Sequence, residues 1–131
     1  MAEAPGRDAL LDRFARIVGD RHALRADADM APYVHERRGL HPGRAALVLR
    51  PGDADEVAKI LALATATGTP VVPQGGNTGL VGGQVPDASG RAVVLSLARM
   101  DRIRALDPAS DTVVAEAGVV LQTLRDAAAA A

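Results

Sequence analysis

Cysteine and tryptophan are absent from this sequence of 131 residues, which also has a single tyrosine and a single phenylalanine. Without cysteine the chain has no disulfides, no thiolate metal ligands and no cysteine nucleophile. The low aromatic content predicts a core of small and branched side chains, although 48% of the residues are hydrophobic. A chain of this length can form one modest domain, or part of a larger one.

The chain also lacks a large net charge of either sign, because it has 15 basic and 16 acidic residues. This balance gives no reason to expect binding to nucleic acid or to an anionic membrane. No apolar run is long enough to cross a bilayer, and the N-terminus lacks the basic start and apolar stretch of a signal peptide. These absences predict a cytoplasmic protein without a membrane span.

The N-terminal third is predicted to hold one helix. Apolar residues recur at spacings of three and four from Asp8 to Val18, and Gly19 follows as a stop. Residues 20–44 contain two prolines, two glycines and many charges, which favour an irregular connection with at most one helical turn. We therefore expect residues 1–44 to be an N-terminal helix with its connecting segment, and residues 45–131 to form the main unit.

A βαβ unit is predicted next. Residues 46–49 are a short apolar run typical of a buried strand, and residues 70–73 are another. Between them, Asp53 and Glu56 form a capping box in which each side chain accepts the other's backbone amide, and Gly68 ends the helix. The apolar face of this helix is expected to contain Val57, Ile60, Leu61 and Ala64.

Further strands and a terminal helix complete the prediction. Residues 92–97 read as a third strand, 103–106 and 112–115 as a hairpin, and the segment from Val120 onward as a helix. The fold class is α/β (α+β). The alanine-rich end carries no helix stop signal, so we expect the chain to end inside an element, with a frayed tail as the alternative.

The segment with a chemical signature is Gln74–Gly83, which has five glycines in ten residues directly after a predicted strand. Such a loop brings backbone amides close to a ligand, and a diphosphate suits converging amides, with Gln74, Asn77 and Thr78 able to add side-chain hydrogen bonds. The spacing does not fit the Rossmann fingerprint, and a triphosphatase loop is excluded because the chain's one lysine is Lys59. A glycine-rich loop without a ligand stays open as an alternative.

Other candidates are weaker. His35-Glu36 lacks the second histidine of a zinc-protease helix, because position 39 is glycine. We expect the three histidines to be exposed or locally bonded, and Arg37, Arg38 and Arg44 to form a solvated charge run. Ser89 and Ser96 lack the surroundings of a serine nucleophile. No metal site is predicted.

Several stretches together resemble one known family. They are Leu49-Arg50-Pro51, Glu56-Val57 with Ile60-Leu61, residues 73–83, Val85-Pro86, Leu95-Ser96, Ala98-Arg99-Met100 and Ala117-Gly118. Over residues 45–125 the chain is similar to flavoproteins of the vanillyl-alcohol oxidase and p-cresol methylhydroxylase type. Within that family it looks most like the D-2-hydroxyacid dehydrogenases, especially those of the 2-hydroxyglutarate type.

The resemblance implies the N-terminal subdomain of a PCMH-type FAD-binding domain. It implies that FAD is bound by Pro73, Gln74, Gly75, Gly76, Asn77, Thr78, Gly79, Leu80, Gly82, Gly83, Met100, Ala117 and Gly118. It further implies hydride transfer to the flavin from a D-2-hydroxyacid of the 2-hydroxyglutarate or lactate type. The electrons would pass to a flavoprotein, a quinone or a cytochrome. Some relatives attach FAD through a histidine where this chain has Asn77, so noncovalent FAD is expected.

The resemblance also implies that catalytic residues lie elsewhere. In the family a second FAD subdomain and a substrate domain follow, so this chain is expected to be a fragment, and no residue in it receives a catalytic role. Two alternatives remain open: a separate module that binds a nucleotide or anion without redox chemistry, and an inactive truncated product.

Overall fold

The structure is a computed structural model that describes residues 6–131, so the first five residues of the predicted N-terminal segment lie outside the described residues. In chain order its elements are α1 (Arg7–Val18), the 3-10 turn η1 (Asp20–His22), β1 (Ala23–Leu24), α2 (Asp27–Val34), β2 (Leu47–Leu49), α3 (Ala54–Thr67), β3 (Val71–Gln74), β4 (Val93–Ser96), β5 (Ile103–Asp107), β6 (Thr112–Ala115) and α4 (Leu121–Ala130). Helices and strands are mixed, which confirms the predicted α+β class.

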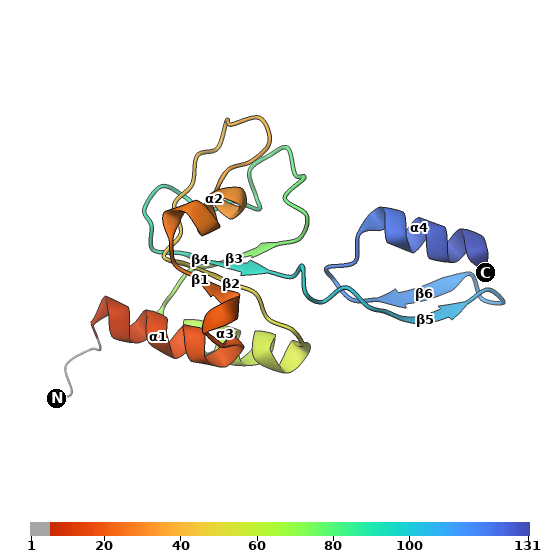
Figure 1. Ribbon diagram of the computed structural model, residues 1–131, viewed down its shortest axis with the longest axis horizontal. Coiled ribbons are helices and arrows are strands. Elements are labelled where there is room, and N and C mark those ends of the chain that lie inside the picture. Colours follow the sequence, from red (N-terminus) through yellow and green to blue (C-terminus); the bar gives the residue numbers. More distant parts are fainter. Residues whose placement is uncertain (1–5) are drawn as a thin grey trace.

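A four-stranded sheet forms the larger part of the molecule, with strand order β1-β2-β4-β3 (Figure 1). Strands β2, β4 and β3 are parallel, and the short β1 pairs antiparallel with β2. The predicted βαβ unit is present, but β4 lies between its two strands. The carboxyl ends of the three parallel strands therefore lie at one edge of the sheet.

Both faces of this sheet are covered, and the alternation of side chains along the strands decides which helix meets which residue. Leu47 and Leu49 of β2 belong to the cluster packed against α1 and α3, whereas Val48 packs with Met30 of α2 on the opposite face (Figure 1). Near-continuous apolar runs are the pattern expected for parallel strands buried on both sides. The larger cluster comprises Phe14, Ala15, Val18, Ala23, Leu47, Leu49, Ile60, Ala64, Val93 and Leu95.

Helix α3 begins and ends close to the predicted positions. The Asp53 carboxylate accepts the amide of Glu56 at 2.9 Å, and Gly68 ends the helix in a left-handed conformation. Two details of the prediction are wrong. The Glu56 carboxylate reaches back to the amide of Gly52, at 2.8 Å, instead of that of Asp53. Leu61 is 44% exposed, because the apolar face of α3 is narrower than predicted.

The prediction of an irregular segment over residues 20–44 is wrong, because this segment contributes β1 and the eight-residue helix α2. Strand β1 extends the sheet by pairing with β2. Helix α2 contains Pro32, which argued against a helix because its missing amide removes an internal hydrogen bond. Burial of Met30 and Val34 stabilises α2 on the sheet.

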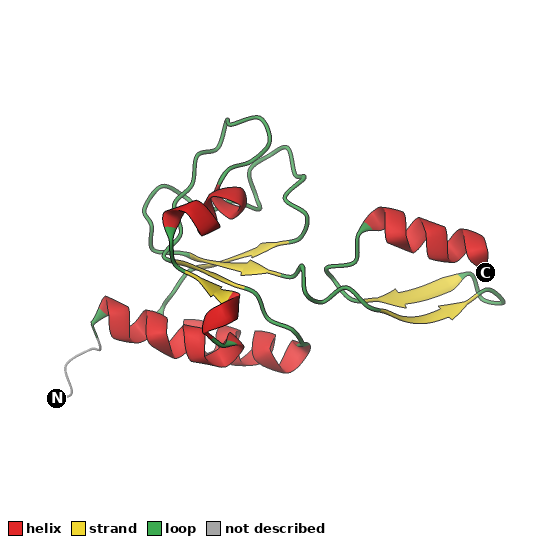
Figure 2. Ribbon diagram, in the orientation of Figure 1, coloured by secondary structure: helices red, strands yellow, loops and turns green. Residues whose placement is uncertain are grey.

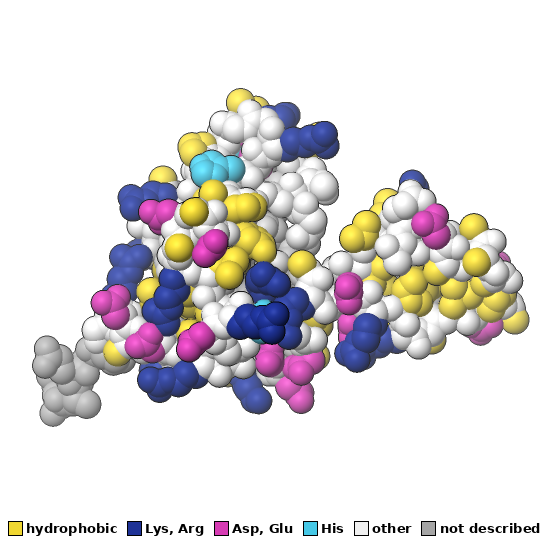
Figure 3. All heavy atoms as spheres, in the orientation of Figure 1, with side chains coloured by type: hydrophobic (Ala, Val, Ile, Leu, Met, Phe, Trp, Pro, Cys, Tyr) yellow, Lys and Arg dark blue, Asp and Glu magenta, His cyan; other side chains and the backbone are white. Residues whose placement is uncertain are grey.

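The predicted hairpin and terminal helix form a second, smaller unit beside the sheet (Figure 2). Every residue of β6 is exposed, and α4 contains no buried residue. Four large apolar side chains of this unit are exposed, and the space-filling view shows apolar atoms over much of its visible face (Figure 3). They are Val113, Val114, Val120 and Leu121. The unit thus has little core of its own, and a hollow of about 350 Å³ lies among residues of β5, β6 and α4.

A buried carboxylate fixes the start of this unit. The side chain of Glu116 is 2% exposed, and it accepts hydrogen bonds from the guanidinium groups of Arg102 and Arg104, both at 2.8 Å. It also accepts the backbone amide of Arg102 at 3.0 Å. The side-chain hydrogen bonds from Arg102 and then Arg104 lower the pKa of Glu116 to about 2.

This carboxylate gives the protein a stability that depends on pH. The pKa of Glu116 is depressed in the folded state, so its stabilising contribution is complete above its ordinary pKa of 4.5 and is lost as the pH falls toward 2. We expect Glu116→Gln to make the fall in urea midpoint between about pH 6 and about pH 3 shallower. The fall persists in part, because the pKa values of Glu36, Asp87 and Asp107 are lowered as well.

Asp126→Asn is the matched control, since Asp126 is an exposed carboxylate on α4 that accepts a hydrogen bond from the neutral Gln122. An equal slope for Glu116→Gln and the unmodified protein would contradict the role given to Glu116.

No helix among residues 6–131 is both long and apolar enough to cross a membrane.

Candidate functional site

The glycine loop, residues 74–83, leaves the sheet at the carboxyl end of β3. Gln74 is paired with Ser96 at the end of β4, and the backbone amide of Leu97 donates to the Gln74 carbonyl at 2.9 Å. In open parallel sheets this edge is where ligands bind, because loops leaving adjacent strands diverge there. Figure 2 shows the loop rising on the side of the sheet that α2 occupies.

The five glycines of the loop are not equivalent. Gly82 has a φ of +77°, and a Cβ there would lie 2.7 Å from the ring of His41, so protein conformation and packing explain it. A Cβ on Gly79 would meet the end of the Gln84 side chain at 2.5 Å. At Gly75 and Gly83 a Cβ would meet nothing within 4 Å, and at Gly76 only a methyl group of Thr78 at 3.8 Å.

Gly75, Gly76 and Gly83 also have ordinary backbone conformations, since a positive φ is found in this loop only at Asn77 and Gly82. Neither conformation nor packing within residues 6–131 therefore requires glycine at these three positions. Their missing side chains leave the backbone open to close approach from outside, which is the arrangement that a bound anion uses.

The side-chain NH₂ groups of two polar loop residues have protein partners. The Gln74 amide donates to the Tyr33 carbonyl at 2.8 Å, and the Asn77 amide donates to those of Pro32 and His35 at 3.0 and 2.8 Å. The Tyr33 and Pro32 carbonyls belong to the last turn of α2 and the His35 carbonyl to the residue that follows it, so no further helical residues satisfy them. The side-chain NH₂ groups of Gln74 and Asn77 are thus engaged in capping α2 and attach the loop to it.

The backbone amides of the loop are available for a ligand. From Gly75 to Gln84, no backbone N–H donates to an acceptor within residues 6–131. Several carbonyls of the same loop are held by protein donors: that of Gly79 by the Gln84 side chain at 2.8 Å, that of Leu80 by Arg38, and that of Gly82 by the Val85 amide at 3.3 Å.

The held carbonyls fix the direction of the amides that follow them. The chain has no cis peptide bond among the described residues, and in a trans peptide the C=O and the next N–H point to opposite sides. The N–H groups of Leu80, Val81 and Gly83 therefore point away from the groups that bind the preceding carbonyls. Such a set of oriented amides can donate hydrogen bonds to the oxygens of a phosphate or diphosphate.

Two buried polar atoms near the loop have no protein partner within residues 6–131. They are Oδ1 of Asn77 and Oγ of Ser96. Ser96 is 1% exposed and lies beside Gln74 in the sheet register, at the strand end from which the loop departs. Unpaired buried polar atoms are rare, and a polar ligand at this edge would satisfy them. The open glycines and the unpaired atoms together fit a nucleotide cofactor.

The structure brings the remaining predicted residues to the same edge. Met100 is buried, its amide donates to the Leu97 carbonyl at 2.9 Å, and its carbonyl accepts the amide of Gly118 at 2.8 Å. A Cβ on Gly118 would overlap the Leu97 carbonyl oxygen, so packing alone explains this glycine. Ala117 lies next to this contact. Pro73 of β3 and the loop residues Thr78 and Leu80 are exposed.

Sequence reasoning missed the segment that holds the far half of the loop. Arg38, predicted to be solvated, donates from its guanidinium to the Leu80 carbonyl, and the ring of His41 lies against Gly82. Glu36, which drew attention only as part of a failed zinc motif, is 3% exposed and accepts the amides of Arg38 and Leu40 at 2.7 and 2.5 Å. The hydrogen bond from the Arg38 amide is the main reason that the pKa of Glu36 is lowered.

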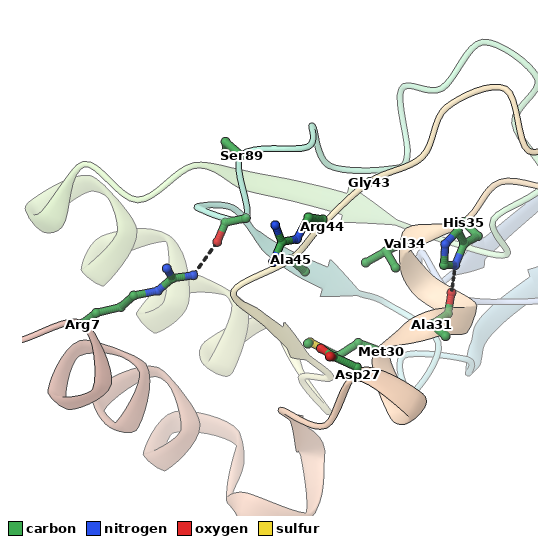
Figure 4. A pocket seen from close by; sticks show the side chains of 11 residues that line it. Arg7, Asp27, Met30, Ala31, Val34, His35, Gly43, Arg44, Ala45 and Ser89 are labelled. Carbon is green, nitrogen blue, oxygen red and sulfur yellow. Dashed lines mark hydrogen bonds between the residues drawn. The ribbon is translucent and has the colours of Figure 1, made fainter.

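A hollow of about 430 Å³ lies elsewhere, at the amino ends of β2 and β4 (Figure 4). Its charges are mixed, with Arg7 and Arg44 near Asp27, and Arg7 already donates to the Gly90 carbonyl at 2.7 Å. It shares no residue with the glycine loop, so it is not part of the candidate site. Within residues 6–131, no group of three or more histidine, aspartate or glutamate side chains could hold a metal ion.

The fold and this site define an α/β unit with a glycine loop at its strand ends, and comparisons with known proteins identify its family. The model of the "FAD binding domain" family matches residues 45–131. The chain belongs to this FAD-binding domain family.

Curated relatives agree with this assignment. The chain is 38% identical to a probable mitochondrial D-2-hydroxyglutarate dehydrogenase of Oryza sativa subsp. indica over 111 residues, which are 85% of the chain and 20% of that protein. It is 34% identical to a quinone-dependent D-lactate dehydrogenase of Corynebacterium glutamicum over 91% of the chain and 21% of that protein. The expected similarity to D-2-hydroxyacid dehydrogenases is confirmed. The chain spans about a fifth of the length of these relatives.

A solved structure supports the predicted fold. The structure of p-cresol methylhydroxylase with substrate bound superposes on this chain with a TM-score of 0.74 at 19% sequence identity. The superposed part covers 95% of this chain and 25% of the p-cresol methylhydroxylase chain. The predicted PCMH-type fold is thereby confirmed.

Proposed function

We propose that the glycine loop binds the diphosphate of FAD through its backbone amides. The main support is the run of backbone N–H groups from Gly75 to Gln84, which donate to no acceptor within residues 6–131. Gly75, Gly76 and Gly83 supply the open approach, and the capping of α2 by Gln74 and Asn77 holds the loop in place. Met100, Ala117 and Gly118 line the same cofactor at the neighbouring strand end.

FAD supplies the redox chemistry in this proposal, and the chain supplies binding and orientation. The loop amides offset the negative charge of the diphosphate, while the packed turn at Met100 and Gly118 keeps backbone close to the strand ends. Residues 45–131 are the first part of the FAD-binding domain, and residues 1–44 are an N-terminal segment that adds α1, β1 and α2 to the same core. No residue of this chain is proposed to be catalytic.

The whole protein is proposed to be an oxidoreductase that converts a D-2-hydroxyacid to the 2-oxoacid and passes the electrons to a separate acceptor. Similarity to proteins named for D-2-hydroxyglutarate and D-lactate supports this substrate class, and one of them is named quinone-dependent. A cytoplasmic location belongs to the proposal, although the rice relative is named as mitochondrial.

The FAD is proposed to be noncovalent. Asn77 stands where a histidine would form the flavin bond, and its amide is engaged with the carbonyls of Pro32 and His35. An amide nitrogen is also a poor nucleophile. FAD is thus held by hydrogen bonds and can dissociate.

One experiment tests these points together. We expect the full protein, purified from its native source, to be yellow. Its flavin absorbance should fall when D-2-hydroxyglutarate or D-lactate is added under anaerobic conditions. Acid precipitation should then release FAD into the supernatant. L-2-hydroxyglutarate is the control and should leave the absorbance unchanged. A colourless protein that binds another nucleotide would instead indicate a module without redox chemistry, and yellow precipitate would contradict noncovalent binding.

A further inference from the structure

The far half of the glycine loop, Leu80–Gly83, has little support of its own. Leu80 and Val81 are 55% and 87% exposed, so burial of their side chains does not hold this half in position. The near half is different, because Gln74 is buried and Asn77 is attached to α2. An exposed loop of glycines without such support would sample many conformations, and a ligand would have to order it.

Residues 36–41, here named the brace, provide two contacts at this far half. The Arg38 guanidinium donates to the carbonyl of Leu80. The imidazole of His41 lies over Gly82, where a Cβ would come within 2.7 to 2.9 Å of three ring atoms. Both contacts come from a segment about 40 positions earlier in the chain, which lies outside the residues matched by the FAD-binding family model.

Glu36 gives the brace its shape. Its carboxylate is buried, and it accepts backbone amides from Arg38 at 2.7 Å and Leu40 at 2.5 Å. The amide of Gly39 in turn donates to the Glu36 carbonyl at 3.0 Å, closing the turn. Buried charge-assisted hydrogen bonds of this kind are among the stronger ones in proteins, so the turn is well determined.

The brace acts on the amides that the proposed function needs. Because the Leu80 carbonyl is bound by Arg38, the N–H of Val81 points to the opposite side of the loop. A Leu80–Val81 peptide that was free to flip would also present its carbonyl to the phosphate side, and a carbonyl repels an anion. Fixing the peptide therefore removes an unfavourable conformation as well as an entropic cost.

We propose that Glu36, Arg38 and His41 are positioning residues that preorganise Leu80–Gly83 for a diphosphate. Glu36 shapes the turn, Arg38 sets the Leu80–Val81 peptide and His41 holds Gly82. None of them is proposed to touch the ligand. The brace itself rests only on protein contacts, whereas its effect on affinity rests on the proposed binding of FAD to this loop.

The test removes the guanidinium donor of Arg38 and measures the backbone order of the loop without FAD and the affinity for FAD. In the FAD-free chain, we expect Arg38→Ala to lower the backbone order parameters of Leu80, Val81 and Gly83 from about 0.8 to below about 0.6, while those of α3 stay unchanged. Titration with FAD should show about tenfold weaker binding. Arg38→Lys keeps a donor and should restore most of both properties.

Arg37→Ala is the matched control, because Arg37 is an exposed arginine next to Arg38. Glu36→Gln provides a second variant with the same readouts. Order parameters that are the same in Arg38→Ala as in Arg37→Ala would overturn the brace, whatever the affinity for FAD. Order parameters that fall in a protein that never binds FAD would support the brace and refute the proposed function.

Discussion

Replacing Gly76 by valine is expected to weaken FAD binding by about 100-fold, or about 2.7 kcal/mol, with little change in the stability of the protein. A Cβ at position 76 meets only a methyl group of Thr78, at 3.8 Å, and the residue does not have a positive φ. The FAD-free fold therefore accommodates the added side chain. The three extra carbons would lie where the diphosphate must approach the backbone amides.

Separation of the two effects makes this prediction specific. A core substitution lowers stability and binding together, whereas a blocked binding surface lowers binding alone. We expect the urea midpoint of Gly76→Val to stay within the range typical of surface substitutions, about 0.5 kcal/mol in unfolding free energy. The affinity is measured by titrating the FAD-free protein with FAD and following flavin fluorescence.

Gly6→Val is the matched control, since a Cβ at Gly6 meets nothing within 4 Å and Gly6 lies at the exposed start of α1, outside the glycine loop. It should bind FAD like the unmodified protein. If Gly76→Val also retains full affinity, the diphosphate does not approach the loop at this position and the site assignment is wrong.

The elements set by local chemistry were predictable from the sequence. The helix from Asp53 to Gly68 carries its own start and stop signals, and its ends match the prediction to within a residue. The apolar runs of β2 and β4 predicted strands because such runs fit a sheet buried on both faces. The five glycines of residues 74–83 likewise identified the loop, since so many glycines are not expected in a buried strand or helix.

What the sequence could not supply depends on contacts between distant residues. Helix α2 forms despite Pro32 because Met30 and Val34 pack on the sheet, which local propensity does not reveal. Nor does the sequence reveal that the NH₂ group of Asn77 contacts the end of a helix some 40 positions away. Arg38 looked solvated for the same reason: its partner is the backbone carbonyl of Leu80, and a carbonyl leaves no signature in the sequence.

Replacing Gly118 by alanine is expected to destabilise the protein by about 3 kcal/mol. A Cβ at this position would overlap the Leu97 carbonyl oxygen and lie 2.8 Å from the carbonyl oxygen of Met100. Both obstacles are backbone atoms, so no side chain can rotate away, and the turn must separate from the end of β4. That separation would also break the hydrogen bond from the Gly118 amide to Met100.

The displacement should affect both the sheet and the smaller unit, because Leu97 and Gly118 lie where the two units meet. The amide of Leu97 donates to Gln74 at the base of the glycine loop, while the Leu97 carbonyl faces Gly118, so displacement of Leu97 disturbs the cofactor edge as well. The hairpin and α4 have little core to hold them once the joint opens. Urea unfolding followed by circular dichroism measures the loss, and hydrogen exchange at the amides of β5 and β6 should accelerate.

Gly75→Ala is the matched control, because its Cβ would meet nothing within 4 Å. Equal urea midpoints for the two alanine variants would show that Gly118 is not in close contact with Leu97, and its glycine would then need the cofactor as its explanation.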